Sequence, residues 1–235
     1  MRGTSFRIDA AAYVRAIPLL VTHPSIVSLP LLAAVVAVLF DQIGGIVTDP
    51  LGGIGSGLLG LVVQIVFLWA FGIAIIQASN VWRGRRGSFD EAWSEGRAKS
   101  GGILMAAIGF QFVMFAAGMV GSLISGFLGT ALSAVAAFFL IYTIPAAAIG
   151  GLPGPMALSA SVRAVRANPA GSIVLAVVFL GLFVFVPIGL QYALGAHLTP
   201  TLYALVMALV QAIVLAYLAF PFAKQYDDVA FRGFW

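Results

Sequence analysis

Six long apolar segments dominate this sequence, and its cations are confined to alternate gaps between them. A helix needs about 20 apolar residues to cross the roughly 30 Å hydrocarbon core of a bilayer. Continuous apolar runs favour helices over barrel strands, whose residues alternate. The sequence therefore predicts an all-α integral membrane protein with six transmembrane helices in a single domain, 1–235. In chain order the expected spans are approximately 25–40, 57–81, 101–122, 130–149, 171–194 and 201–223.

The placement of the charges predicts the orientation of these helices. All 12 Lys and Arg residues lie before the first span, between the second and third, between the fourth and fifth, or after the sixth. With six spans they share one face, which the positive-inside rule makes cytoplasmic, whereas an odd number would scatter them. We therefore expect both termini on the cytoplasmic side of a bacterial inner membrane. Asp9 and Pro18 interrupt the first apolar stretch, so we expect no cleavable signal peptide.

Composition agrees with a membrane location. The chain is 62% hydrophobic and 9% charged, whereas soluble domains are about 45–50% apolar and about 25% charged. Because membrane topology accounts for the net charge of +4, we expect no nucleic-acid partner.

Each cytoplasmic segment that precedes an odd-numbered span reads as a short amphipathic helix lying in the membrane interface. Ser88 and Glu91 form a capping box before the second of these elbow helices. Pro155 suits the first turn of the third. An apolar face defines the first elbow through Val14, Ile17 and Val21. The fold expected is three tandem units, each an interfacial amphipathic elbow helix plus a helical hairpin, at approximately 6–84, 88–150 and 155–233.

Local matches support an internal repeat between the first and third units. Pro24 matches Pro169 at the two elbow junctions, and Gln64 matches Gln211 further along. The alternative interpretation is that helices rich in Ala, Leu and Val all look alike.

Residues 144–172 contain a proline-bearing helix, a Gly-Pro turn and an amphipathic segment, carried by Ile144-Pro145, Gly151-Leu152-Pro153-Gly154-Pro155, Ala157-Leu158, Ser161 and Asn168. This stretch, with Tyr226-Asp227 near the end, resembles the membrane domain of glycerophosphoryl diester phosphodiesterases and the related YciC-like bacterial inner-membrane proteins. The resemblance implies a six-span layout and carries over no functional residues. The soluble phosphodiesterase domain of those enzymes has no counterpart in the sequence.

The residue types that hydrolytic chemistry requires are sparse. Cysteine is absent, and the two histidines, His23 and His197, are expected on opposite membrane faces. Metal-assisted hydrolysis uses clustered carboxylates and histidines, whereas Glu91 and Glu95 are expected on a solvated elbow. We therefore expect no enzymatic activity, no cofactor and no metal site.

One hypothesis is a non-enzymatic integral membrane module that organises lipid or partner proteins at the cytoplasmic membrane. Cations near anionic phospholipid each contribute about 1 kcal/mol, so the basic elbows would contact lipid or a membrane-protein partner through Arg83, Arg85, Arg86, Arg163 and Arg166. The alternative is that these cations only set the topology.

A second hypothesis is a small permease, or a transporter of lipids or small molecules, with a site between the repeats. Gln64, Gln111 and Gln211 are the candidates to line its cavity. Alternatively, these amides hold helices together through hydrogen bonds of about 0.6–2 kcal/mol each. No charged residue is expected at mid-bilayer, which weighs against an ion-coupled carrier.

Overall fold

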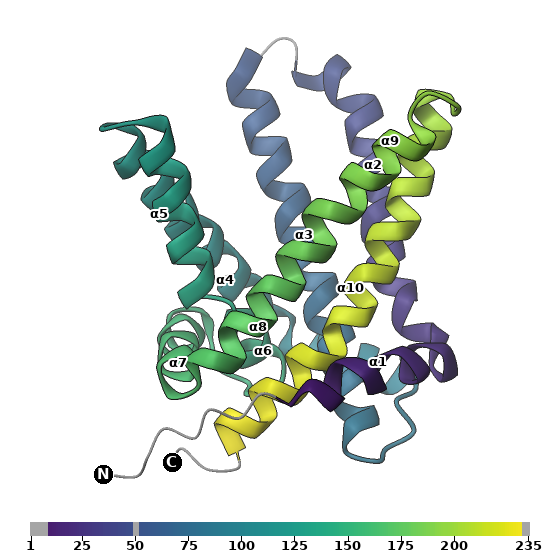
Figure 1. Ribbon diagram of the computed structural model, residues 1–235, viewed down its shortest axis with the longest axis vertical. Helices are drawn as coiled ribbons and strands as arrows, with labels where there is room; N and C mark the ends of the chain where they lie inside the picture. Colours follow the sequence, from purple (N-terminus) through teal and green to yellow (C-terminus); the bar gives the residue numbers. More distant parts are fainter. Residues whose placement is uncertain (1–8, 49–51, 232–235) are drawn as a thin grey trace.

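The computed structural model describes residues 9–48 and 52–231, and every regular element in these ranges is helical (Figure 1). Among the described residues five helical segments are long and apolar enough to cross a membrane, and the number is six if the bent pair at the start counts as one span. This arrangement is compatible with a helical membrane protein. In chain order the elements are α1 (Ala10–Thr22), η1 (Pro24–Val27), α2 (Ser28–Thr48), α3 (Gly52–Trp82), α4 (Phe89–Ser122), α5 (Gly126–Phe139), α6 (Thr143–Ala148), α7 (Gly154–Ala167), α8 (Pro169–Leu180), η3 (Gly181–Phe185), α9 (Val186–Leu194) and α10 (Pro200–Phe231).

The molecule has two distinct ends. The short helices α1, α6 and α7 gather at the lower end of Figure 1, which we call the elbow end. The last turn of α2, the first turn of α3 and the connections α4–α5 and α9–α10 lie at the other end, which we call the hairpin end.

Helix α1 forms the first elbow. The helix pair made of α1 and the segment Pro24–Phe40 bends by 97°. One face of α1 is buried through Ala16, whereas Val14, Ile17 and Val21 are 68%, 58% and 74% exposed. An amphipathic elbow at this position was predicted, and the structure contains it.

The predicted second elbow is wrong, because α4 runs unbroken for 34 residues from Phe89 to Ser122. Ser88 does cap its first turn, accepting from the Glu91 amide at 3.3 Å. The two elbows that do form each end immediately before a proline, which disfavours helical geometry in the residue ahead of it. Residues 97–102 contain no proline, so the elbow and the following span join into one helix.

The first and third elbow junctions share a backbone conformation. The C-cap residue of α1 is His23, with φ −128° and ψ 61°. The C-cap residue of α7 is Asn168, with φ −137° and ψ 73°, and α8 begins at once with Pro169. The Asn168 side chain accepts from the Gly171 amide at 3.1 Å and caps α8.

Two of the predicted spans contain local breaks. The fourth divides into α5 and α6 around a turn at residues 140–142. The fifth contains the π-helical segment η3 between α8 and α9. The combined lengths, Gly126–Ala148 and Pro169–Leu194, still suffice to cross a bilayer.

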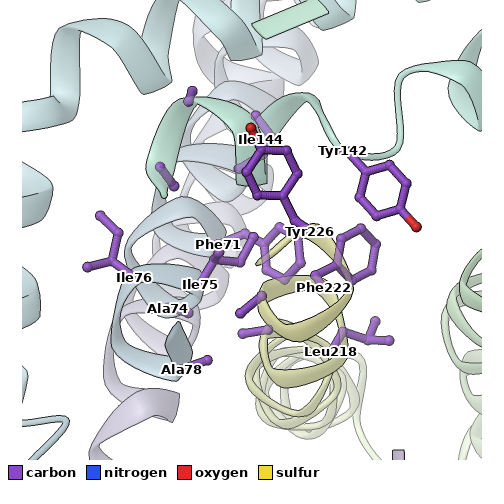
Figure 2. Packing of buried hydrophobic residues seen from close by; sticks show 14 of the residues in the cluster. Phe71, Ala74, Ile75, Ile76, Ala78, Tyr142, Ile144, Leu218, Phe222 and Tyr226 are labelled. Atoms are coloured by element: carbon purple, nitrogen blue, oxygen red, sulfur yellow. The ribbon is translucent and has the colours of Figure 1, made fainter. Parts of the chain in front are cut away.

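The best-packed part of the core lies between α3, α6 and α10 toward the elbow end (Figure 2). Phe71 and Phe222 meet edge to face with ring centroids 5.3 Å apart. Small residues such as Ala74 and Ala78 allow α3 to be buried almost completely here. This packed region forms the base on which the more open hairpin end rests.

Candidate ligand cavity

A cavity of about 520 Å³ lies between α3, α4, α5, α8 and α10 and is partly open to its surroundings. Small-molecule sites in proteins typically measure about 300–1,000 Å³. The cavity is therefore large enough for a ligand rather than for a few water molecules.

The three glutamines proposed from the sequence all border this cavity. Gln64 lies on α3, Gln111 on α4 and Gln211 on α10. Gln64 is exposed, and the other two are half-buried. Within the described residues, none of these three side chains makes a hydrogen bond to another part of the protein. Helix-to-helix bonding therefore does not explain them here, and the three residues border the cavity without a hydrogen bond to the described protein.

The rest of the lining is apolar and rich in aromatic rings. Seven of the lining residues are phenylalanine, and none of the described lining residues is charged. Phe179 connects two ring pairs, stacking on Phe183 at 4.7 Å and meeting Phe222 edge to face at 6.1 Å. Phe71 extends this wall onto α3. The cavity can therefore hold an apolar molecule, and it offers no nucleophile–base pair.

A buried polar network lies on the elbow-end side of the cavity. Gln225 Nε2 donates to the Tyr13 hydroxyl at 2.6 Å, and the Tyr142 hydroxyl donates to Gln225 Oε1 at 3.0 Å. Ser172 Oγ in turn donates to the Tyr142 hydroxyl at 3.2 Å. These four residues come from α1, α10, the α5–α6 turn and α8, so the network ties the first elbow to the floor of the cavity.

The α5–α6 break has its own polar support. Ser161 on α7 accepts from the Tyr142 amide and donates to the Phe139 carbonyl, both at 2.9 Å. Backbone groups freed by a broken helix are costly in an apolar environment unless side chains satisfy them. Sequence reasoning missed this network, because its members are far apart in the chain. The one available signal was the cluster of Tyr, Gln and Ser in otherwise apolar helices.

The five arginines proposed as lipid contacts all lie at the elbow end. Arg83 pairs with Asp227 at 2.7 Å, and Arg85 donates to Asn80 Oδ1 at 3.4 Å. Arg86 is exposed in the turn between α3 and α4. Arg163 and Arg166 are exposed on α7, at a separate position on the same end. Arg163 also borders a second cavity of about 130 Å³ beside Tyr226.

No group of three or more Asp, Glu or His side chains that could hold a metal ion gathers in residues 9–48 and 52–231.

Searches with family models, among curated proteins and among solved structures each find no match to this chain. The family resemblance at residues 144–172 stays a prediction.

Proposed function

We propose that this chain is a non-enzymatic membrane protein that binds a lipid or small molecule between its helices and carries it within or across the bilayer. One observation supports this proposal above the others. Three carboxamides from three different helices border one ligand-sized cavity and have no bonding partner among the described residues. Unpaired polar groups in an apolar environment cost free energy, and a bound ligand with polar atoms would offset this cost.

The proposed layout has six spans in three tandem units, with both termini on the cytoplasmic side of a bacterial inner membrane. The matching backbone angles at His23 and Asn168 support a relation between the first and third units. The continuous α4 makes the middle unit a variant without a separate elbow. The cavity then lies where the three hairpins meet.

Filling the cavity tests the binding proposal. Ala176 lines the cavity on α8, whereas its neighbour Val177 does not line it and is 63% exposed. Ala176→Phe should reduce the lipid or small molecule retained after purification, and Val177→Phe should leave it unchanged, as measured by native mass spectrometry. A second variant, Ala134→Phe on α5, fills the same cavity from another helix, so a folding defect confined to α8 would not affect it. Equal retention in wild type and both filling variants would contradict the proposal.

Single cysteines test the proposed topology, since the natural chain has none to interfere. Ser94, Ser125 and Ser159 are all exposed. Ser94→Cys and Ser159→Cys should react with a membrane-impermeant maleimide only from the cytoplasmic side, and Ser125→Cys only from the other. Labelling of Ser94→Cys and Ser159→Cys from opposite sides would contradict the six-span layout.

A second candidate is the module that organises anionic lipid at the cytoplasmic face. The exposed apolar face of α1 favours it, because an interfacial helix sinks such a face into the headgroup region. The ion pair between Arg83 and Asp227 weakens it, because a paired cation attracts phosphate less strongly. Replacing Arg85 and Arg86 with Glu should lower the anionic lipid retained in native mass spectra if this candidate holds. Unchanged anionic lipid would leave these cations as topology signals.

A further inference from the structure

We infer that the ligand of the cavity is an uncharged amphiphile, with an apolar body and a head that bears hydroxyl or carbonyl oxygens. Monoacylglycerols and quinones share this chemistry. The inference rests on the proposed function, because it names the ligand class of the same cavity.

The absence of charge among the described lining residues disfavours a charged group enclosed within the cavity. A phosphate or carboxylate would lose its hydration on entering the cavity and gain no cation there. Such an unpaired ion in an apolar medium costs several kcal/mol. The described arginines lie at the elbow end, beyond the packed base of the cavity, so they cannot neutralise a head bound at the glutamines.

On α3 and α10 the lining glutamines lie nearer the hairpin end than the lining phenylalanines Phe71 and Phe222. Along α3, Phe71 lies two helical turns, roughly 10 Å, closer to the elbow end than Gln64. Along α10, Phe222 lies three turns, roughly 16 Å, closer to that end than Gln211. Phe71 and Phe222, whose rings are packed together in Figure 2, both line the cavity. A ligand with one polar end and one apolar end matches this arrangement, and its head would lie toward the hairpin end.

The carboxamides can form hydrogen bonds with the oxygen atoms of such a head. Each glutamine offers an NH₂ group with two donors and one carbonyl acceptor. Hydroxyl and carbonyl oxygens accept from the NH₂ groups, and a hydroxyl can also donate to the carbonyls. A pure hydrocarbon would leave all three amides unpaired, which disfavours it relative to an amphiphile.

The π-helical segment η3 is an independent sign of function in this wall. Such segments are rare and are often found at functional sites. Here η3 carries Phe183, and its stacked partner Phe179 lies one turn earlier on α8. Both Phe179 and Phe183 line the cavity.

Matched probes test the charge preference. The protein in nanodiscs is titrated with 1-monolauroylglycerol, with its 3-phosphate ester, and with decylubiquinone, and binding is followed by competition with the radiolabelled monoacylglycerol. The uncharged probes should bind at least about tenfold more tightly than the phosphate ester. Whichever uncharged probe binds more tightly identifies the source of the ligand, glycerolipid or quinone.

Substitution of the glutamines tests whether they contact the ligand. The double variant Gln64→Leu with Gln211→Leu should weaken binding of the tighter uncharged probe about tenfold without lowering the Tm of the free protein. Gln191→Leu, an exposed amide on α9 outside the cavity, is the matched control and should change nothing. Equal or tighter binding of the phosphate ester would overturn the ligand class while leaving the cavity as a binding site. If no probe binds and Ala176→Phe retains the same lipid as wild type, the proposed function itself fails.

Discussion

Five glutamines of this protein fall into two groups that lie in different regions. At the elbow end, Gln77 and Gln225 are 2% and 5% exposed, and each makes two hydrogen bonds to other segments. In the cavity, Gln64, Gln111 and Gln211 make none within the described chain. The same side chain therefore serves as a structural link in one region and remains available to a ligand in the other.

Residue type alone therefore does not reveal the role of a glutamine inside an apolar helix. A buried amide with partners contributes to stability, and its loss leaves those partners unsatisfied. An amide without protein partners costs free energy in an apolar site unless a ligand or water forms hydrogen bonds with it. Substitution by leucine separates the two roles, and the expected effects follow from the largest to the smallest.

Gln225→Leu should have the largest effect. It removes the bonds to Tyr13 and Tyr142 and leaves both hydroxyls short of a partner in the core. The free energy of unfolding should fall by about 2–3 kcal/mol, measured by reversible denaturation in mixed micelles. An unchanged free energy of unfolding would show that the hydrogen bonds of Gln225 do not stabilise the fold.

Gln77→Leu should have the next largest effect. Gln77 Nε2 donates to Ser25 Oγ and to the Gly87 carbonyl, both at 2.8 Å, and so links η1 to the α3–α4 turn. We expect a loss of about 1–2 kcal/mol in the same assay. A larger loss than for Gln225→Leu would show that the α3–α4 turn, rather than the network under the cavity, is the main polar link.

Arg83→Ala should lower the free energy of unfolding by a smaller amount. Its ion pair with Asp227 is partly exposed, with side-chain exposures of 40% and 20%. Exposed pairs typically contribute about 0.2–1 kcal/mol, so we expect about 0.5 kcal/mol, decreasing as salt is added. A salt-independent loss above about 2 kcal/mol would show that the pair is effectively desolvated.

Gln211→Leu should have the smallest effect on the free protein. With no bond to lose, the free energy of unfolding should stay the same or rise by a few tenths of a kcal/mol. Thermal unfolding without added ligand measures this. A loss comparable to that of Gln225→Leu would show that the cavity amides are structural after all.

The sequence predicted most of the helical layout, for identifiable reasons. Apolar length locates a span, and a proline after the elbow locates its break, as at Pro24 and Pro169. The prediction of a second elbow was wrong because a charged N-terminal segment does not by itself break a helix that has no proline at the junction. The α5–α6 turn and η3 were missed because apolar composition hides local changes of pitch.

The candidate site was accessible from the sequence only in part. Amides inside apolar helices are unusual enough to be noticed, which singled out Gln64, Gln111 and Gln211. Their aromatic wall was not predictable, since phenylalanine is common on every span. The network of Tyr13, Tyr142 and Gln225 joins segments that only the folded chain brings together.

An experimental density map of the protein in lipid nanodiscs would show whether the cavity holds a ligand. We expect an elongated density in the cavity, with its polar end within hydrogen-bonding distance of at least two of Gln64, Gln111 and Gln211. A map in which the cavity has closed and these amides bond to one another would contradict it.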